Sequence, residues 1–261
     1  MNKADMLNTK FIIAGPCVLE SKDMCLEIAK YCKSICDEYG FTYVFKASFD
    51  KANRTSIDSF RGPGLKKSID AFVEIRKHVG FITTDIHEPY QAKEIAPYVD
   101  IIQIPAFLCR QTDLLVAAGE TGKIVNIKKA QFLSVDKMEH AIKKIYNTGN
   151  KNVMLTERGS MMGMDDLVVD FRNIHKLKQF GCPVVMDVTH ACQTYKQTNG
   201  ITGGNRIYGP LFAQCAKIFG ADGTFAEVHP SPEEALSDSA NTMNFDMFEN
   251  MVRTLATLEG D

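Results

Sequence analysis

Short runs of apolar, often β-branched residues alternate along the chain with segments in which apolar residues recur every three or four positions. The first pattern is typical of buried strands and the second of helices that cover them. Eight strands are predicted: Phe11–Cys17, Thr42–Ser48, Phe81–His87, Ile101–Phe107, Ile124–Ala130, Val153–Gly159, Val184–His190 and Gly223–His229. Alternation of this kind predicts parallel strands joined by helical crossovers.

Two segments show the helical period clearly. In Val135–Tyr146, one face carries Val135, Met138, Ala141, Ile142 and Ile145, and Ser134 stands at the expected N-cap. The last predicted helix covers Asn241–Leu258, with Met243, Met247, Met251 and Leu255 turned inward. Both helices are therefore expected to pack one apolar face against the sheet.

Eight strand–helix units in 261 residues predict a closed (β/α)8 TIM barrel that forms one domain over residues 1–261, with a short lead at 1–10. An open doubly wound sheet is the alternative. Such a sheet usually carries a glycine-rich fingerprint after its first strand, and Ala14-Gly15-Pro16-Cys17 is not one. No linker, repeat or low-complexity tract divides the chain. These observations favour the barrel.

Polar residues gather where the predicted strands end. They are Cys17, Lys46 with Ser48, Asp85 with His87, Gln103, Lys128 with Lys129, Glu157 with Arg158, Asp187 with His190, and Glu227 with His229. Any one of them alone is better explained as a solvated strand end. A barrel, however, brings the carboxyl ends of all its strands to one mouth, so together they predict a convergent active site.

Composition and charge limit the classes of partner that the chain can bind. Apolar residues make up 45% of the chain and the formal net charge is -2, so there is no basic excess to hold a nucleic-acid backbone. No apolar run is long enough to cross a bilayer, and the first ten residues lack the pattern of a secretory signal. The eight cysteines include no Cys-x-x-Cys pair. We therefore expect a cytoplasmic protein with reduced thiols that binds neither nucleic acid nor membranes.

The densest polar segment follows the second predicted strand. It runs from Lys46 to Ser56 and contains Ser48, Lys51, Asn53, Arg54 and Thr55. Cations and hydroxyl donors suit phosphate and carboxylate oxygens, and Lys128 and Arg158 would add their charges at the same mouth. Five cations exceed the need of one anionic group, so two anionic substrates are indicated. A solvated basic loop is the alternative.

A second set combines a thiol, an imidazole and two carboxylates. Cys17, His190, Glu227 and Asp238 are ligands that a divalent ion such as Zn2+, Fe2+ or Mn2+ accepts. No local spacing ties them together, and a lone cysteine at a strand end more often serves packing. By pattern alone, the metal site is only one of two interpretations.

Over essentially its full length the chain resembles the 3-deoxy-D-manno-octulosonate 8-phosphate synthase family. The carrying segments are Ala14-Gly15-Pro16-Cys17-Val18-Leu19-Glu20-Ser21, Phe45 to Arg54, Gln103 to Asp113, Asp187-Val188-Thr189-His190, Glu227-Val228-His229-Pro230 and Ser237-Asp238. Lys51-Ala52-Asn53-Arg54 is the most specific, because the related synthase of the seven-carbon shikimate precursor typically carries a Lys-Pro-Arg-Thr type motif there.

The resemblance implies condensation of phosphoenolpyruvate with D-arabinose 5-phosphate, with release of inorganic phosphate and of an eight-carbon acid sugar used in lipopolysaccharide. It assigns Lys46, Ser48 and Lys51 to the phosphoenolpyruvate carboxylate region, and Lys128 and Arg158 to its phosphate. It assigns Asn53, Arg54, Thr55 and Ser56 to the sugar phosphate. The strand-end residues Asp85 and Gln103 are placed with these substrate-binding residues.

The resemblance also implies a metal and an assembly. The metal-independent class of the family has Asn where this chain has Cys17, so Cys17, His190, Glu227 and Asp238 imply the metal-requiring class. The catalytic set is Lys51, a candidate proton donor to the aldehyde oxygen, Asp238, a candidate acceptor for the proton of water, and His190. Arg110 resembles a residue that reaches a neighbouring subunit's site, which implies a homotetramer.

Three rival functions remain at this stage. One is a phosphoenolpyruvate-dependent synthase that acts on another aldose phosphate, such as erythrose 4-phosphate. Another is a zinc-dependent barrel aldolase, which would release no phosphate. A non-enzymatic sugar-phosphate-binding barrel would predict decayed strand ends, whereas here each expected cation and ligand is present.

Overall fold

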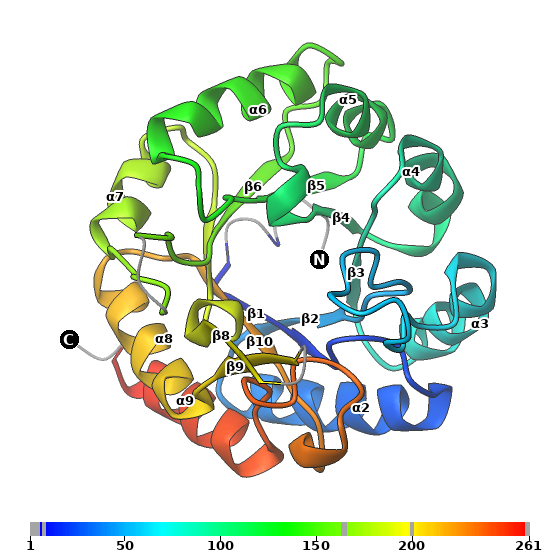
Figure 1. The fold of residues 1–261 in the computed structure, drawn as a ribbon, viewed down its shortest axis with the longest axis vertical. Helices are drawn as coiled ribbons and strands as arrows, with labels where there is room; N and C mark the ends of the chain where they lie inside the picture. The colour runs from blue at the N-terminus through cyan, green and yellow to red at the C-terminus, as the bar shows by residue number, and fades with distance from the viewer. Residues whose placement is uncertain (1–5, 7–8, 163–165, 199–200, 259–261) are drawn as a thin grey trace.

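Eight parallel strands close into a barrel, and helices surround it (Figure 1). The computed structural model describes residue 6 and residues 9–162, 166–198 and 201–258. The barrel strands are β1 (Phe11–Gly15), β2 (Thr42–Lys46), β3 (Phe81–Asp85), β4 (Ile101–Ile104), β5 (Ile124–Lys128), β6 (Val153–Glu157), β7 (Val184–Asp187) and β10 (Gly223–Glu227). Each strand pairs in parallel with the next, and β1 closes the ring between β10 and β2. The predicted (β/α)8 barrel is confirmed.

The helices cover the outside of the barrel. They are α2 (Lys22–Glu38), α3 (Leu65–Arg76), α4 (Pro89–Ile95), α5 (Thr112–Glu120), α6 (Met138–Tyr146), α7 (Arg172–Lys178), α8 (Gly209–Ile218) and α9 (Phe245–Thr257). Short 3-10 helices are η1 (Ala96–Tyr98), η2 (Ala106–Leu108), η3 (Val135–Lys137), η4 (His190–Cys192), η5 (Arg206–Tyr208) and η6 (Pro232–Glu234). Among the described residues, no helix is long and apolar enough to cross a membrane.

The strands end two or three residues earlier than the apolar runs predicted. Pro16 directly follows β1 and Pro105 directly follows β4. Proline has no backbone N–H to donate to a neighbouring strand, which explains both endings. The polar groups assigned to strand ends therefore divide between the last strand residues and the loops that follow.

Two helix predictions need correction. The segment at 135–146 begins as the 3-10 helix η3, and the Ser134 side chain makes no capping hydrogen bond. The last helix starts at Phe245 rather than at 241, because Asn244 caps it by accepting a hydrogen bond from the Met247 backbone. Met243 is buried, but its backbone pairs with the chain beyond β10 and is not helical.

One element was not predicted at all. A two-stranded antiparallel hairpin, β8 (Gln193–Thr198) and β9 (Ile201–Gly204), is inserted after β7. Its strands are polar and glycine-rich, so they lack the apolar alternation by which a strand is recognised. The hairpin lies beside the carboxyl end of the barrel, where it supplies residues to the mouth described below.

The barrel interior is apolar at its amino end. Phe11, Ile13, Val44 and Phe225 belong to a cluster of buried side chains inside the ring, and Met6 from the lead packs with them. Outward-facing strand residues such as Ile12 pack against the helices in a second, larger cluster. The two clusters reflect the alternation of side chains along a strand. Only the carboxyl end of the interior is thus left for polar groups.

Candidate active site

Alternation along the strands decides which polar side chains enter the barrel. Ile124 on β5 faces the interior, so Lys128, four residues later, faces it too. Lys129 points the other way and forms a buried ion pair with Glu157, their Nζ and Oε1 atoms 3.3 Å apart. Of the two adjacent lysines, one is available to a ligand in the barrel mouth and the other holds the outer wall.

Four predicted metal ligands converge at the mouth. Single ligand atoms of Cys17, Glu227 and Asp238 all lie within 4.8 Å of one another. His190 Nε2 lies 3.6 Å from Glu227 Oε1 and 3.7 Å from Asp238 Oδ2. The four residues come from the ends of β1, β7 and β10 and from the loop after β10. Chain segments far apart in sequence therefore present one thiol, one imidazole and two carboxylates to a single point.

The donor set fits a divalent cation. Glu227 is completely buried, yet neither of its side-chain oxygens has a hydrogen-bond partner within the described part of the chain. A buried carboxylate without a hydrogen-bond partner is costly unless positive charge compensates it. Burial, and then the charge of Glu227, raise the pKa of the Cys17 thiol well above its usual value. A bound cation would offset both effects by stabilising the thiolate and the carboxylate.

Asp187 orients His190. His190 Nδ1 lies 2.8 Å from Asp187 Oδ2, and the other oxygen of Asp187 accepts hydrogen bonds from the backbone of Thr189 and His190. Burial alone would raise the pKa of Asp187, but His190 and Lys128 hold that pKa well below its usual range. The charge contact with Asp187 on the Nδ1 side leaves Nε2 facing the cluster.

Lys46 and Lys128 both face one side of the mouth. Their Nζ atoms lie 5.8 Å and 3.9 Å from the centre of the same Phe225 ring. Lys128 Nζ donates to Asp187 at 2.5 Å, and burial lowers the pKa of this lysine although Asp187 opposes the shift. The two ammonium groups therefore lie close together, as predicted for the cationic strand ends.

Asp85 organises the end of β2 and β3. It accepts a hydrogen bond from Ser48 at 2.5 Å, lies 3.2 Å from Lys46 Nζ and 3.1 Å from His87 Nε2. Burial alone would raise the pKa of Asp85, but Lys46 and His87 hold it well below its usual value. Gln103, also predicted here, is buried, and its side-chain oxygen has no partner among the described residues.

Lys51 lies between the cationic and the acidic groups. Its Nζ is 4.0 Å from Glu227 Oε1. Burial by itself would lower the pKa of Lys51, but the thiolate form of Cys17 and then the Glu227 carboxylate raise that pKa above its usual value. The ammonium form is therefore strongly favoured beside the four-residue cluster.

Arg158 reaches the cluster through a residue that sequence reasoning missed. One guanidinium nitrogen donates to Gln193 Oε1 at 2.6 Å, and Gln193 Nε2 donates to Asp238 Oδ1 at 3.0 Å. Gln193 is the first residue of β8, three positions after His190. In the sequence, only its position close to His190 could have indicated that Gln193 belongs to the site.

The predicted sugar-phosphate residues are not brought together by the single chain. Asn53, Thr55 and Ser56 are exposed on the loop between β2 and α3. Arg54 reaches another segment, since it donates to Ser237 Oγ at 2.7 Å and to the Leu236 carbonyl at 2.8 Å, whereas Ser56 Oγ accepts only a local hydrogen bond from the Asp58 backbone among the described residues. The Arg54 bonds tie the loop to the segment that carries Asp238.

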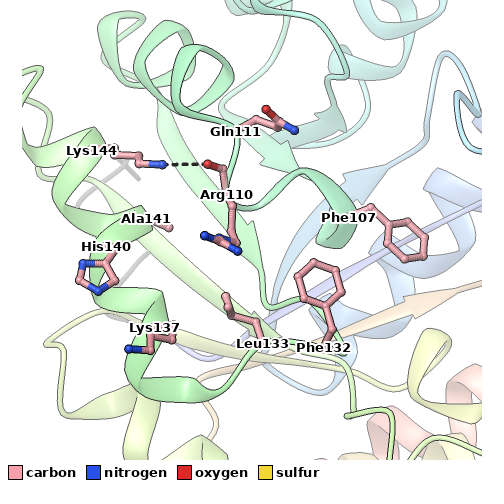
Figure 2. A pocket seen from close by; sticks show the side chains of 9 residues that line it. All are labelled: Phe107, Arg110, Gln111, Phe132, Leu133, Lys137, His140, Ala141 and Lys144. Carbon is pink, nitrogen blue, oxygen red and sulfur yellow. Dashed lines mark hydrogen bonds between the residues drawn. The ribbon is translucent and has the colours of Figure 1, made fainter. Parts of the chain in front are cut away.

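Arg110 lies in a separate groove of about 680 Å3 (Figure 2). The groove runs between the start of α5 and α6, and Phe107 and Phe132 stand at one end of it. Lys144 donates a hydrogen bond to the Arg110 backbone carbonyl. The Arg110 guanidinium, on an exposed residue, takes no part in this bond. Within one chain, the groove is lined by none of the mouth residues described above.

Known proteins match the chain over nearly its whole length. A 2-dehydro-3-deoxyphosphooctonate aldolase of Desulfatibacillum aliphaticivorans is 48% identical over 248 residues, which cover 95% of this chain and 91% of that protein. Enzymes of the same name from Cyanothece sp. and Fusobacterium nucleatum subsp. nucleatum are 46% and 47% identical, over 95% and 93% of this chain and 91% and 87% of their own lengths. The family model described as the DAHP synthetase I family matches residues 7–259. The chain, with its charged barrel mouth, belongs to the DAHP synthetase I family.

Proposed function

We propose that this chain condenses phosphoenolpyruvate with D-arabinose 5-phosphate and water to give 3-deoxy-D-manno-octulosonate 8-phosphate and inorganic phosphate, a step of lipopolysaccharide synthesis. One observation carries the proposal: Lys46, Lys51, Lys128 and Arg158 share a barrel mouth with the cluster of Cys17, His190, Glu227 and Asp238. Cations of that number suit two phosphorylated substrates. The similarity to 2-dehydro-3-deoxyphosphooctonate aldolases agrees with this reaction.

Phosphoenolpyruvate binds at the bottom of the mouth. Lys46, Ser48 and Lys51 receive its carboxylate, and Lys128 and Arg158 its phosphate. Arg158 is buried, and one of its guanidinium nitrogens, Nη1, has no hydrogen-bond partner within the described residues. A buried arginine with an unused nitrogen is well placed to donate to an incoming phosphate oxygen.

D-Arabinose 5-phosphate binds above it, under the loop of Asn53, Arg54, Thr55 and Ser56. The side chains of Asn53, Thr55 and Ser56 are exposed and can turn toward a ligand phosphate, Ser56 by giving up its hydrogen bond from the Asp58 backbone. Arg54 exchanges its contact with Ser237 for the sugar phosphate as this second substrate enters. With phosphoenolpyruvate below and the sugar phosphate above, the aldehyde lies next to the vinyl carbon. Catalysis then comes largely from holding the two reacting carbons in place.

A divalent ion would be held by Cys17, His190, Glu227 and Asp238, as in the metal-requiring class of the family. When bound, it would supply Lewis acidity that polarises the aldehyde or orients the water. The soft thiol and the hard carboxylates together accept Zn2+, Fe2+ or Mn2+.

The vinyl carbon of phosphoenolpyruvate attacks the aldehyde carbon, water adds to the cationic central carbon, and the hemiketal expels phosphate. Lys51, whose Nζ lies 4.0 Å from Glu227 beside the cluster, protonates the aldehyde oxygen. Asp238 accepts the proton of the attacking water, and His190 is held toward that water by Asp187.

The working assembly is a homotetramer in which Arg110 completes a neighbouring subunit's site. Two apolar surfaces support this assembly: Phe107 and Phe132 beside the Arg110 groove, and Ile207, Leu211 and Ile218 on and next to α8, all at least half exposed. Figure 1 places α5 and α8 on different sides of the barrel. A tetramer with two-fold axes needs two such self-complementary surfaces.

Phosphate release tests the proposal. The protein is assayed with phosphoenolpyruvate and either D-arabinose 5-phosphate or D-erythrose 4-phosphate, with and without a chelator. We expect phosphate release with the five-carbon sugar, loss of activity after chelation, and recovery when Zn2+, Fe2+ or Mn2+ is returned. A preference for erythrose 4-phosphate would assign the chain to the related synthase, and carbon–carbon bond formation without phosphate release would indicate a barrel aldolase.

A further inference from the structure

Gln193 lies between the two halves of the mouth. Its Oε1 accepts a hydrogen bond of 2.6 Å from Arg158 Nη2, and its Nε2 donates one of 3.0 Å to Asp238 Oδ1. Arg158 belongs to the phosphate-binding half and Asp238 to the metal-binding half. One side chain thus contacts a member of each.

The amide is chemically matched to this place. It offers one acceptor and two donors, whereas a guanidinium can only donate and an ionised carboxylate can only accept. A glutamate at 193 would meet Asp238 with a second acceptor and a like charge, and a lysine would repel Arg158. A neutral group that accepts on one side and donates on the other satisfies both neighbours at once.

The bond to Gln193 also determines which oxygen of Asp238 faces the cluster. Oδ1 is occupied by Gln193, while Oδ2 lies 3.4 Å from Cys17 Sγ and 3.7 Å from His190 Nε2. Asp238 has a backbone φ of 48°, in the left-handed region that non-glycine residues seldom adopt.

The hairpin holds Gln193 against the Asp238 loop. Gln193 pairs with Gly204 across the hairpin, and a Cβ at Gly204 would lie 1.8 Å from the Asn241 side-chain oxygen. Asn241 Nδ2 in turn donates to the Gly203 carbonyl at 3.3 Å. Because the hairpin packs this closely, Gln193 has a fixed base from which to reach Asp238.

We propose that Gln193 is a positioning residue that presents a single oxygen of Asp238 to the divalent ion and turns the free nitrogen of Arg158 toward the phosphate of phosphoenolpyruvate. The inference deepens the proposed function and rests on it. The Gln193 amide thus affects the affinity for the metal and for phosphoenolpyruvate. Binding of arabinose 5-phosphate does not depend on this amide.

The test replaces the amide with an apolar side chain of similar length, Gln193→Met, and with the shorter amide, Gln193→Asn. Gln179→Met, on an exposed residue at the end of α7, is the matched control. Co2+ affinity is measured from the thiolate absorption of Cys17 without substrates, and phosphoenolpyruvate affinity by calorimetry on the metal-free protein. KM for each substrate and the melting temperature of each protein complete the set.

We expect Gln193→Met to weaken Co2+ binding about 10- to 100-fold, the usual effect of losing an outer-shell partner. Phosphoenolpyruvate affinity falls as well. At saturating metal, KM for arabinose 5-phosphate and the melting temperature stay near wild type, and Gln193→Asn lies in between. In an Arg158→Ala background, Gln193→Met has no further effect on phosphoenolpyruvate binding, because the two residues act as one unit.

Unchanged Co2+ and phosphoenolpyruvate affinities in a folded Gln193→Met protein would overturn the inference and leave the proposed function intact. Wild-type protein that binds Co2+ without a Cys17 absorption would instead contradict the metal site of the proposed function, and with it the Asp238 half of the inference. An equal loss of affinity in Gln179→Met would also overturn it, since a general loss of stability would then account for the effect.

Discussion

At the scale of single residues, the mouth is built from opposite charges that compensate one another inside the barrel. Asp85 contacts Lys46 and His87, and Asp187 contacts Lys128 and His190. Burying any of these groups alone would be costly, so each pair must be satisfied within the fold. When a substrate anion binds Lys46 or Lys128, Asp85 or Asp187 still lies next to a histidine.

Asp85 links the stability of the protein to pH. Because the folded-state pKa of Asp85 lies below its unfolded value of about 3.9, its contribution is present above that value and is lost as pH falls toward the folded pKa. Asp85→Asn should therefore flatten the acid side of the stability curve by up to about 1.4 kcal/mol per pH unit. Denaturant unfolding between about pH 2 and 5, around and below the unfolded pKa of Asp85, measures this, with the exposed Asp113→Asn as control; equal slopes in both variants would contradict the prediction.

Cys17 gives the metal site its sharpest test. Cys17→Asn removes the thiolate, so we expect Co2+ to bind at least about 10-fold more weakly and without thiolate absorption. Cys215→Asn, at an exposed cysteine, should leave both unchanged. Metal titration followed by absorption distinguishes the two. Full activity of the chelated wild-type enzyme would exclude a required metal.

At the scale of elements, close contacts between strands set where the charged ends lie. Gly15 ends β1 directly beside β2, and a Cβ there would lie 2.0 Å from the Lys46 carbonyl oxygen. Backbone on both sides makes this contact difficult to relieve. The position of Lys46 in the mouth therefore depends on a glycine in the neighbouring strand.

Gly15→Ala should lower the free energy of unfolding by about 3 kcal/mol, at the upper end of overpacking costs. It should also raise KM for phosphoenolpyruvate, because Lys46 must move with its backbone. Gly80→Ala, where a Cβ meets nothing within 4 Å, should change stability by no more than about 0.5 kcal/mol. Denaturant unfolding of the two variants is the measurement, and similar values would show that β1 and β2 can separate locally.

The apolar pattern predicted the elements unevenly. All eight barrel strands were predicted, because each contains a run of apolar, often β-branched residues that is buried in the folded protein. The hairpin at 193–204 was missed, since its polar, glycine-rich strands gain their pairing from each other and from Asn241. The start of α9 was placed too early, because Met243 is buried in the core without being helical: its backbone pairs with Val228 in the chain that follows β10.

At the scale of the whole molecule, the single chain brings the four proposed metal ligands together and leaves the proposed sugar-phosphate residues apart. Asn53, Thr55 and Ser56 are exposed, and Arg110 lies in a groove apart from the mouth. A second subunit that brings its Arg110 to this loop would close the site. The exposed Phe107 and Phe132 beside Arg110 give that contact an apolar centre.

Complementation between subunits tests this arrangement. Lys46→Ala and Arg110→Ala tetramers should each be nearly inactive, but tetramers mixed at equal ratio should regain about a quarter of wild-type sites, because one interface combines an intact Lys46 with an intact Arg110. Phosphate release by co-expressed, doubly tagged protein is the measurement. No recovery in mixed tetramers would place Arg110 outside the neighbouring site.

The sequence by itself determined the barrel, the approximate place of its eight strands, and the identity of most charged groups in the mouth. It could do so because the buried strands of a parallel sheet are continuous apolar runs, and the barrel topology then brings all their carboxyl ends together. Only the tertiary structure decided that Lys128 faces the mouth while Lys129 pairs with Glu157, and that Gln193 joins Arg158 to Asp238. Those contacts depend on distances of a few ångströms between segments remote in the chain, and no local pattern carries that information.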